Sequence, residues 1–276
     1  REDMDITVLD WLDRTAERIP DKTAFIDESG SLTFREVNEI AKAVGSHLLK
    51  YKKERQPILV MSGRHRFTPV CFLGVVYSGN FYAPIDATMP TTRLLQILDV
   101  IQADVLIVDR ENQKKAEELQ FQGTVLIMEE LMELTETDEK GLAKVRGGMS
   151  SDMPLYTIFT SGSTGIPKGV ITSHYSLMCY IDAVSEVLHI GEEDRMGNQS
   201  PLDYIAAIRD IYFPVKDGAT TVILPKQYFA VPAKLFEALN QYEVTTLCWS
   251  SSALTIPAQM KAFEYEVPRF LKKVCF

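Results

Sequence analysis

The chain has 276 residues, of which 46% are hydrophobic and 24% charged, a composition that predicts a globular protein of one large or two ordinary domains. Its formal net charge of −9 argues against nucleic acid as the main partner. The longest apolar run, residues 70–77, is too short to cross a bilayer, so we expect no membrane partner.

The four cysteines, Cys71, Cys179, Cys248 and Cys275, are scattered along the chain and form no Cys-x-x-Cys pair. This distribution suits free thiols in a reducing cytoplasm and argues against a disulfide framework or a zinc site. Residues 1–5 do not resemble a secretory signal. We therefore expect a cytoplasmic protein.

Strand and helix patterns alternate through residues 1–128. Thr33 and Glu36 form a capping box before a helix whose apolar residues, from Val37 to Leu48, recur on one stripe. Further helices are expected at about 65–78, 94–101 and 112–119, and strands at 23–27, 57–61, 105–108 and 124–128. Strands that alternate with helices indicate a mostly parallel sheet covered on both faces, so we interpret this part as a first α/β lobe.

Residues 129–153 are acidic and then rich in Gly and Ser, and we interpret them as a polar connector with a short surface helix over 129–134. A second α/β lobe is expected over 154–276. Its expected elements are helices at about 173–188 and 233–240 and strands at 220–224, 245–249 and 273–276. The predicted fold class is therefore α/β, with two lobes of mostly parallel sheet and helices on both faces.

The most informative segment of the second lobe begins with an apolar run, residues 155–159, and continues into six consecutive small residues. These are Thr160, Ser161, Gly162, Ser163, Thr164 and Gly165, and Lys168 follows them. Glycines let successive backbone N–H groups converge on an anion, the hydroxyls add donors, and the lysine adds a full positive charge. The sequence therefore predicts a loop that binds phosphate.

This loop differs from two better-known phosphate-binding motifs. A Walker A loop requires Gly-Lys followed by Ser or Thr, whereas Lys168 stands between Pro167 and Gly169. A dinucleotide fingerprint also fails, because Gly162, Gly165 and Gly169 are spaced three and four residues apart.

Residues 160–169, Thr-Ser-Gly-Ser-Thr-Gly-Ile-Pro-Lys-Gly, resemble the phosphate-loop signature of the adenylate-forming (AMP-binding) enzymes. These include acyl-CoA synthetases, luciferases and the adenylation domains of nonribosomal peptide synthetases. Residues 79–86, Gly-Asn-Phe-Tyr-Ala-Pro-Ile-Asp, and 32–37, Leu-Thr-Phe-Arg-Glu-Val, resemble two more elements of peptide-synthetase adenylation domains, in matching order and spacing. The resemblance covers essentially the whole chain and favours the peptide-synthetase and D-alanine-ligase branch over the fatty-acyl branch.

The resemblance implies that a carboxylate attacks the α-phosphorus of ATP to give an acyl-adenylate and pyrophosphate. The acyl group would then pass to the phosphopantetheine thiol of a peptidyl or acyl carrier protein. The implied cofactors are ATP and Mg²⁺, and residues 160–165 with Lys168 would spread the charge of the pyrophosphate leaving group. The alternatives are an aryl- or acyl-CoA synthetase, or a non-catalytic lobe of this fold.

The residues that bind the carboxylic substrate are expected within 200–212, because amino-acid-activating relatives have there an aspartate that pairs with the substrate α-ammonium. In one register Asp203 takes that place. In the other register the family pattern is aligned on residues 210–212 and 218–219, and Ile205 takes the place of the aspartate. We prefer this second register because the alignment then needs no gap. An isoleucine cannot neutralise a buried ammonium, so the substrate then lacks an α-amine or carries its amine elsewhere.

Asp203 has two interpretations under the preferred register. If this stretch is extended, Asp203 shares a face with Ile205 and would meet the displaced amine of a β-amino acid. Alternatively, Asp203 caps a helix that begins near Tyr204.

Two more residues are substrate-site candidates through the resemblance. His174 stands where relatives often have a histidine near the nucleotide, and Trp249 stands where relatives line the adenine and substrate pocket. The ordinary alternatives are a surface histidine at a helix start and a core tryptophan at a strand end. His47, His65 and His189 show no metal-ligand spacing, so no metal site is expected.

Relatives carry later segments that this sequence lacks. A Tyr-Gly-Pro-Thr-Glu segment contacts adenine and supplies a glutamate for Mg²⁺, an aspartate holds the ribose, and a C-terminal domain brings the catalytic lysine. The sequence stops at Phe276, before these segments. We therefore expect an N-terminal part of such an enzyme, inactive or weakly active alone, with its catalytic lysine elsewhere.

Overall fold

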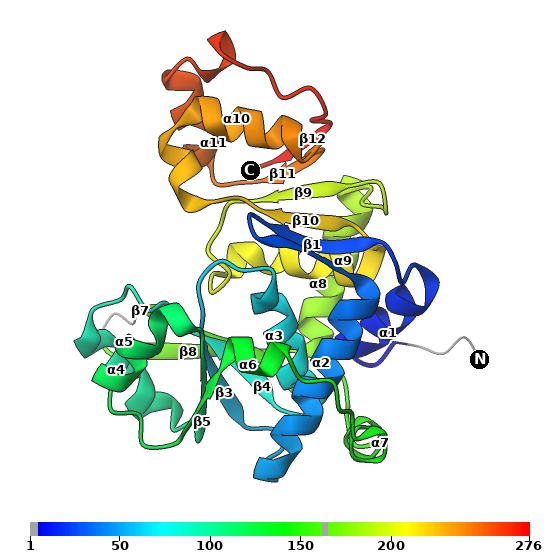
Figure 1. Cartoon of the computed structure of the whole chain (residues 1–276), viewed down its shortest axis with the longest axis vertical. Helices are drawn as coiled ribbons and strands as arrows, with labels where there is room; N and C mark the ends of the chain where they lie inside the picture. The colour runs from blue at the N-terminus through cyan, green and yellow to red at the C-terminus, as the bar shows by residue number, and fades with distance from the viewer. Residues whose placement is uncertain (1–4, 162–164) are drawn as a thin grey trace. The chain divides into compact units, whose positions relative to one another are not determined.

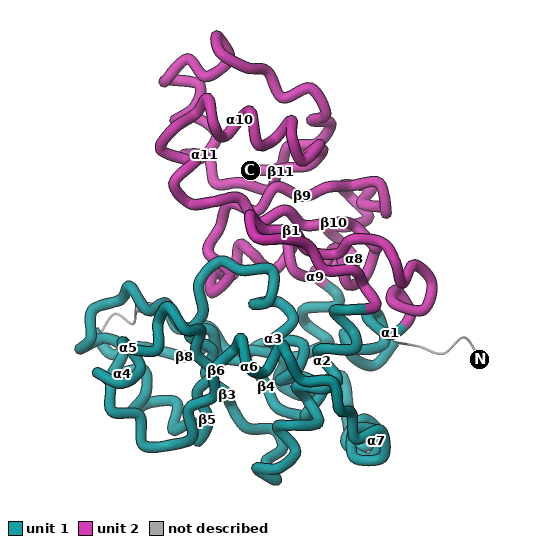
Figure 2. Tube along the Cα trace, viewed as in Figure 1, with its two compact units in different colours: residues 1–13, 36–179 teal, residues 14–35, 180–276 magenta. Residues whose placement is uncertain are grey.

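The structure is a computed structural model that describes residues 5–161 and 165–276. The chain divides into two compact units (Figure 2). Unit 1 comprises Arg1–Asp13 and Glu36–Cys179, and unit 2 comprises Arg14–Arg35 and Tyr180–Phe276. In the described residues, each unit is built on its own six-stranded sheet.

The sheet of unit 1 is parallel except at one edge (Figure 1). Its strands in spatial order are β6 (Thr124–Ile127), β5 (Val105–Val108), β3 (Pro57–Met61), β4 (Phe81–Pro84), β7 (Pro154–Ser161) and β8 (Pro167–Ser173). The edge strand β8 is antiparallel to β7, with Phe159 opposite Gly169. The parallel strands all end at one edge of the sheet, so the segment after β7 lies where ligands commonly bind in such folds.

Helices cover both faces of this sheet. α4 (Thr91–Ile101) and α5 (Gln113–Glu118) bury apolar side chains in a core that includes Ala83 of β4. The neighbouring side chain, Tyr82, points to the opposite face, where Phe72 of α3 (Phe67–Tyr77) stacks on it with ring centroids 4.3 Å apart. The helix α3 is apolar on all sides and is buried along almost its whole length, as a helix inside a core must be.

The sheet of unit 2 has the same plan, parallel with one antiparallel edge strand. Its strands in spatial order are β12 (Lys273–Cys275), β11 (Thr246–Cys248), β9 (Arg195–Asn198), β10 (Thr220–Ile223), β1 (Thr23–Asp27) and β2 (Gly30–Thr33). The β1 strand runs parallel to β10, with Phe25 opposite Thr221. α10 (Pro232–Gln241) and α11 (Ser251–Gln259) bury Leu235 and Ala253 in a core that also holds Trp249.

The remaining helices are α1 (Val8–Arg18), α2 (Phe34–Leu48), α6 (Met128–Met132), α7 (Glu139–Gly147), α8 (His174–Leu188) and α9 (Ile208–Asp217). Short 3-10 helices occur at η1 (Leu49–Tyr51), η2 (Arg110–Asn112), η3 (Ile205–Ala207), η4 (Lys226–Ala230) and η5 (Ala262–Glu264). Across residues 5–161 and 165–276, none of these helices has the length and apolar character of a transmembrane segment.

The α/β class predicted from the sequence is confirmed, and so are most of the local elements. The strands expected at 23–27, 57–61 and 105–108 have those bounds, and the helix expected after the Thr33 capping box is α2. The elements that the sequence patterns did not indicate include α1, β2, β9 and α7. The start of α1 nevertheless has a local signal, because Asp10 accepts a hydrogen bond from the backbone N–H of Thr7 at 2.8 Å.

The expected lobe boundaries, 1–128 and 154–276, need correction. β7 and β8 belong to unit 1, because β7 pairs in parallel with β4, with Tyr156 opposite Tyr82. The segment 14–35 belongs to unit 2, because β1 pairs with β10. The expected connector, 129–153, contains α7 and most of α6 and lies within unit 1. Local patterns indicate that a strand forms, but they do not indicate which strand it pairs with.

Candidate functional site

The predicted phosphate loop joins the two strands at the edge of the unit 1 sheet. Thr160 pairs with Lys168 across β7 and β8, and the ladder ends where Ser161 pairs with Pro167. Gly162, Ser163 and Thr164 lie outside the described residues. The described ends of the loop therefore lie at the carboxyl edge of the parallel strands, as expected for a ligand-binding loop.

Thr160 and Lys168 are exposed and share one face of the strand pair, since residues directly opposite each other point the same way. The hydroxyl of Thr160 donates to the carbonyl oxygen of Lys168 at 3.5 Å. The pairing places a hydroxyl and an ammonium-bearing side chain beside each other at the foot of the loop. Such a pair can act on a phosphate group through a hydrogen bond and a positive charge.

Two glycines of the motif have different structural roles. Gly165 has a φ of +80° and open space around its missing side chain, so its backbone conformation alone favours glycine. Gly169 lies opposite Phe159, and an added Cβ would come within 3.0 Å of Thr157 Oγ1 and 3.3 Å of Phe159 Cε1. The first glycine therefore serves the loop conformation, and the second serves close packing of the strand pair.

The sequence analysis missed one residue that contacts this loop. Arg93, in the first turn of α4, donates from Nη1 to the carbonyl of Gly165 and from Nη2 to the carbonyl of Thr160, both at 3.1 Å. These partners lie 72 and 67 residues away along the chain. No local pattern marks such a contact, because it depends on α4 packing beside β8.

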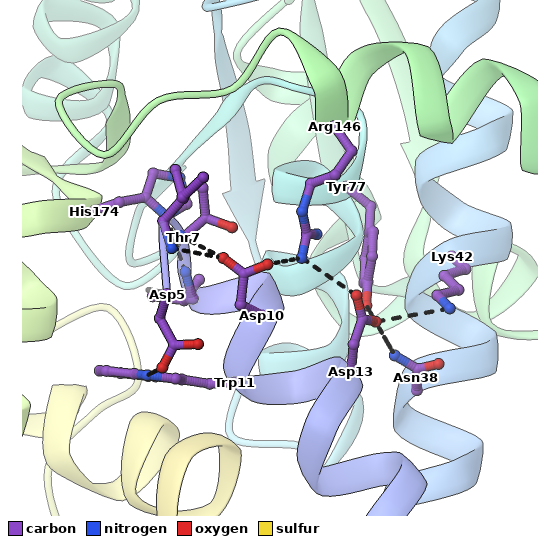
Figure 3. Close-up of polar contacts among 12 residues, drawn as sticks. Asp5, Thr7, Asp10, Trp11, Asp13, Asn38, Lys42, Tyr77, Arg146 and His174 are labelled. Atoms are coloured by element: carbon purple, nitrogen blue, oxygen red, sulfur yellow. Dashed lines mark hydrogen bonds and ion pairs between the residues drawn. The ribbon is translucent and has the colours of Figure 1, made fainter. Parts of the chain in front are cut away.

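His174 does not lie near the phosphate loop. His174 begins α8 directly after β8, whereas Lys168 lies near the start of β8. At about 3.3 Å per strand residue, roughly 20 Å separate the two residues. The His174 side chain is fully buried, and its Nδ1 accepts a hydrogen bond from the backbone N–H of Val8 at 3.3 Å (Figure 3). The surface alternative is therefore wrong, whereas a nucleotide contact by His174 stays a prediction.

Burial, and to a smaller extent the nearby Arg146, lower the pKa of His174 to about 4 despite the opposing charge of Asp10, so the ring is neutral at physiological pH. Beside it, Arg146 binds Asp10 at 2.6 Å and Asp13 at 3.3 Å, and the Tyr77 hydroxyl donates to Asp13 at 2.5 Å (Figure 3). These bonds connect the start of α1 to α3 and α7. Each charge in this group has a partner, which indicates a structural role.

The segment proposed to contact the substrate amine belongs to unit 2, and it is not extended. Asp203 lies in a turn, Tyr204 is the N-cap of η3 without a side-chain capping bond, and Ile205 begins η3. The extended stretch that would place Asp203 and Ile205 on one face is therefore wrong, and the N-cap position of η3 belongs to Tyr204 and not to Asp203. Ile205 is 66% exposed, so its side chain is available to a ligand.

Trp249 lies in the core of unit 2. It is 3% exposed, its indole N–H donates to the carbonyl of Gly197 at 2.7 Å, and its ring meets Phe229 edge-on at 5.2 Å between centroids. The core alternative considered for this residue is therefore confirmed. A contact between Trp249 and a ligand stays a prediction.

Tertiary structure brings together three residues that sequence spacing did not associate. Nitrogen and oxygen atoms of His65, Asp109 and Glu111 lie within 4.8 Å of one another, after the ends of β3 and β5. Asp109 is buried, and it accepts hydrogen bonds from the backbone N–H groups of Gly63 and Asn112 at 2.7 and 3.0 Å. Mg²⁺ prefers an octahedral shell of oxygens with several waters. These three side chains do not fit Mg²⁺, because one is the imidazole of His65 and the Asp109 carboxylate already accepts hydrogen bonds from the backbone.

Comparison with solved structures shows the fold of the adenylate-forming enzymes. The peptide synthetase FmoA3, in its AMPPNP-bound form, superposes with a TM-score of 0.82 at 22% identity, over 96% of this chain and 28% of that one. The chain belongs to the AMP-binding enzyme family, whose pattern matches residues 12–275.

Curated relatives agree with this membership. The D-alanine–D-alanyl carrier protein ligase of Listeria monocytogenes serovar 1/2a is 28% identical over 239 residues, which are 86% of this chain and 46% of that protein. A mycosubtilin synthase protein of Bacillus subtilis is 28% identical over 258 residues, which are 93% of this chain and 9% of that protein. The chain thus covers about half the length of the carrier-protein ligase and a small part of the synthase protein.

Proposed function

We propose that the protein activates a carboxylic acid with ATP as an acyl-adenylate and passes the acyl group to the phosphopantetheine thiol of a carrier protein. The observation that carries this proposal is the family phosphate motif at the carboxyl edge of the unit 1 sheet, with Thr160 and Lys168 exposed beside each other. The family match over residues 12–275 supports acid activation as the general chemistry.

In the proposed reaction a carboxylate oxygen bonds to the α-phosphorus of ATP, and the bond from that phosphorus to the bridging oxygen breaks. Pyrophosphate leaves with an additional negative charge. Lys168 and the Thr160 hydroxyl would stabilise that charge, because preorganised donors act most strongly where charge develops. Mg²⁺ is expected to arrive with ATP, and no described group of this chain is assigned to it.

The substrate is proposed to lack an ordinary α-amine or to carry its amine at another carbon, as a β-amino acid does. Support comes from the register in which an apolar residue, Ile205, replaces the aspartate that binds an α-ammonium. The exposed Ile205 side chain would contact the apolar part of such an acid. Asp203, two residues earlier and half-buried, is the proposed partner of a displaced amine.

The acceptor is proposed to be a carrier protein, which is also named in the description of the 28% identical D-alanine–D-alanyl carrier protein ligase. The test is ATP–pyrophosphate exchange by the protein in its natural length, across α-amino, β-amino, hydroxy and aryl acids. Exchange with one class, followed by loading of a phosphopantetheinylated carrier, supports the proposal. Transfer to free coenzyme A instead would assign an acyl- or aryl-CoA synthetase, and absence of exchange with every acid would contradict activation altogether.

A further inference from the structure

The guanidinium of Arg93 contacts both ends of the phosphate loop. Nη1 donates to the carbonyl of Gly165 and Nη2 to the carbonyl of Thr160, each at 3.1 Å. Thr160 is on the incoming strand β7, and Gly165 is in the segment that leads to β8. One rigid group thus bonds to the chain at both ends of the loop, where the chain leaves β7 and where it approaches β8.

We propose that Arg93 is a positioning residue for nucleotide binding, which fixes the two described ends of the phosphate loop, Thr160 and Gly165, from the first turn of α4; its catalytic consequence rests on the proposed function. The guanidinium is planar and presents paired donors in a fixed geometry, so it can hold two carbonyls at a defined separation. A lysine at the same place would offer a single charge centre on a flexible stem.

Arg93 is anchored in a rigid part of the fold. The next residue of α4, Leu94, is fully buried, as is Ile97 one turn later, and both lie in the core beneath the sheet of unit 1. The helix therefore cannot move without opening that core. A loop tied to it at both ends has fewer conformations to lose when a ligand binds, and this preorganisation raises affinity.

The two hydrogen bonds also orient the loop peptides. The described residues contain no cis peptide bond, and a trans peptide points its N–H away from its C=O. With the carbonyls of Thr160 and Gly165 turned toward Arg93, the N–H groups of the following residues, Ser161 and Ile166, point away from it. The positive charge of Arg93 lies beside these two loop ends, where it adds to the attraction for a polyphosphate.

The first test is hydrogen–deuterium exchange without nucleotide, which measures loop order directly. The variants are Arg93→Met and Arg93→Lys, with Lys115→Met as the matched control. Lys115 of α5 donates to Thr91 Oγ1 at 2.7 Å, so the control also removes one charge and one hydrogen bond near the start of α4. Peptides covering 158–161 and 166–170 should exchange faster in both Arg93 variants and at the wild-type rate in the control. Wild-type exchange in Arg93→Met would overturn the proposal.

The second test measures binding with ATP and with adenosine as probes. Both Arg93 variants should bind ATP at least about tenfold more weakly, as expected for the loss of a charge-assisted hydrogen bond, and should bind adenosine as the wild type does. Full rescue by Arg93→Lys would overturn the role of the paired donors. If the wild type does not bind ATP but Arg93→Met still loosens the loop ends, the proposed function and the role in nucleotide binding are both contradicted, and only the ordering of the loop ends by Arg93 is supported.

Discussion

Thr160 and Lys168 stand directly opposite each other on β7 and β8, one pair before the ladder ends at Ser161 and Pro167. The pairing fixes the lysine at the foot of the phosphate loop, although seven residues separate the two in sequence. It brings the charge and a hydroxyl to the same face of the strand pair.

Lys168→Ala should slow ATP–pyrophosphate exchange by roughly a hundred- to a thousandfold, the range for removing one group that stabilises developing charge. Because Lys168 is exposed, the melting temperature of this variant should stay close to that of the wild type. Lys144→Ala, which removes an exposed lysine from α7, is the control and should exchange normally. Equal exchange rates for Lys168→Ala and the control would remove Lys168 from the mechanism.

Gly165→Ala should destabilise the loop by about 1–2 kcal/mol, because an alanine at a φ of +80° strains the backbone. Gly147→Ala is a matched control, since a Cβ at either position meets nothing within 4 Å and Gly147 lies in α7. That control should be neutral or slightly stabilising. Thermal unfolding and the KM for ATP are the measurements, and a harmless Gly165→Ala would show that the left-handed conformation is not required.

The stability of unit 1 should fall as the pH is lowered from about 6.5 toward 4. Burial holds the pKa of His174 at about 4 in the folded chain, against 6.5 as its ordinary value, so the unfolded chain binds the proton first. The stabilisation that depends on neutral His174 is complete above pH 6.5, the ordinary pKa of histidine, and is lost on acidification. It amounts to on the order of 3 kcal/mol. Urea unfolding at several pH values measures it.

His174→Asn is the test variant for this pH dependence, because the amide oxygen can still accept the hydrogen bond from Val8 but does not titrate. Its stability should change less than that of the wild type between pH 6.5 and 4. Part of the acid dependence should persist, since hydrogen bonds from Thr7 and Arg146 outweigh the effect of burial and lower the pKa of Asp10. Parallel pH curves for the two proteins would show that His174 does not supply the effect.

Ile205→Asp should shift substrate preference toward ordinary α-amino acids, because in the preferred register it restores the carboxylate with which relatives pair the α-ammonium. The exposed position should tolerate the change without loss of stability. Asp203→Asn should instead weaken exchange with β-amino acids if Asp203 binds a displaced amine. A substrate panel in which the wild type already prefers α-amino acids would contradict both expectations.

Local structure was predictable wherever the cause lies within a few residues of the chain. The stripe from Val37 to Leu48 predicts α2, and the apolar run at 57–61 predicts β3. The turn at Asp203 was not predictable, because η3 begins at Ile205 and its N-cap, Tyr204, makes no side-chain capping bond.

The sequence by itself determined the α/β class and the family motif, since periodicity and residue type act between near neighbours. Tertiary structure decided that β7 joins β4 in unit 1 while β1 joins β10 in unit 2, that His174 is buried, and that Arg93 holds both ends of the loop. These outcomes depend on which surfaces pack together across many tens of residues, and the stability of that packing is not encoded in any single local stretch.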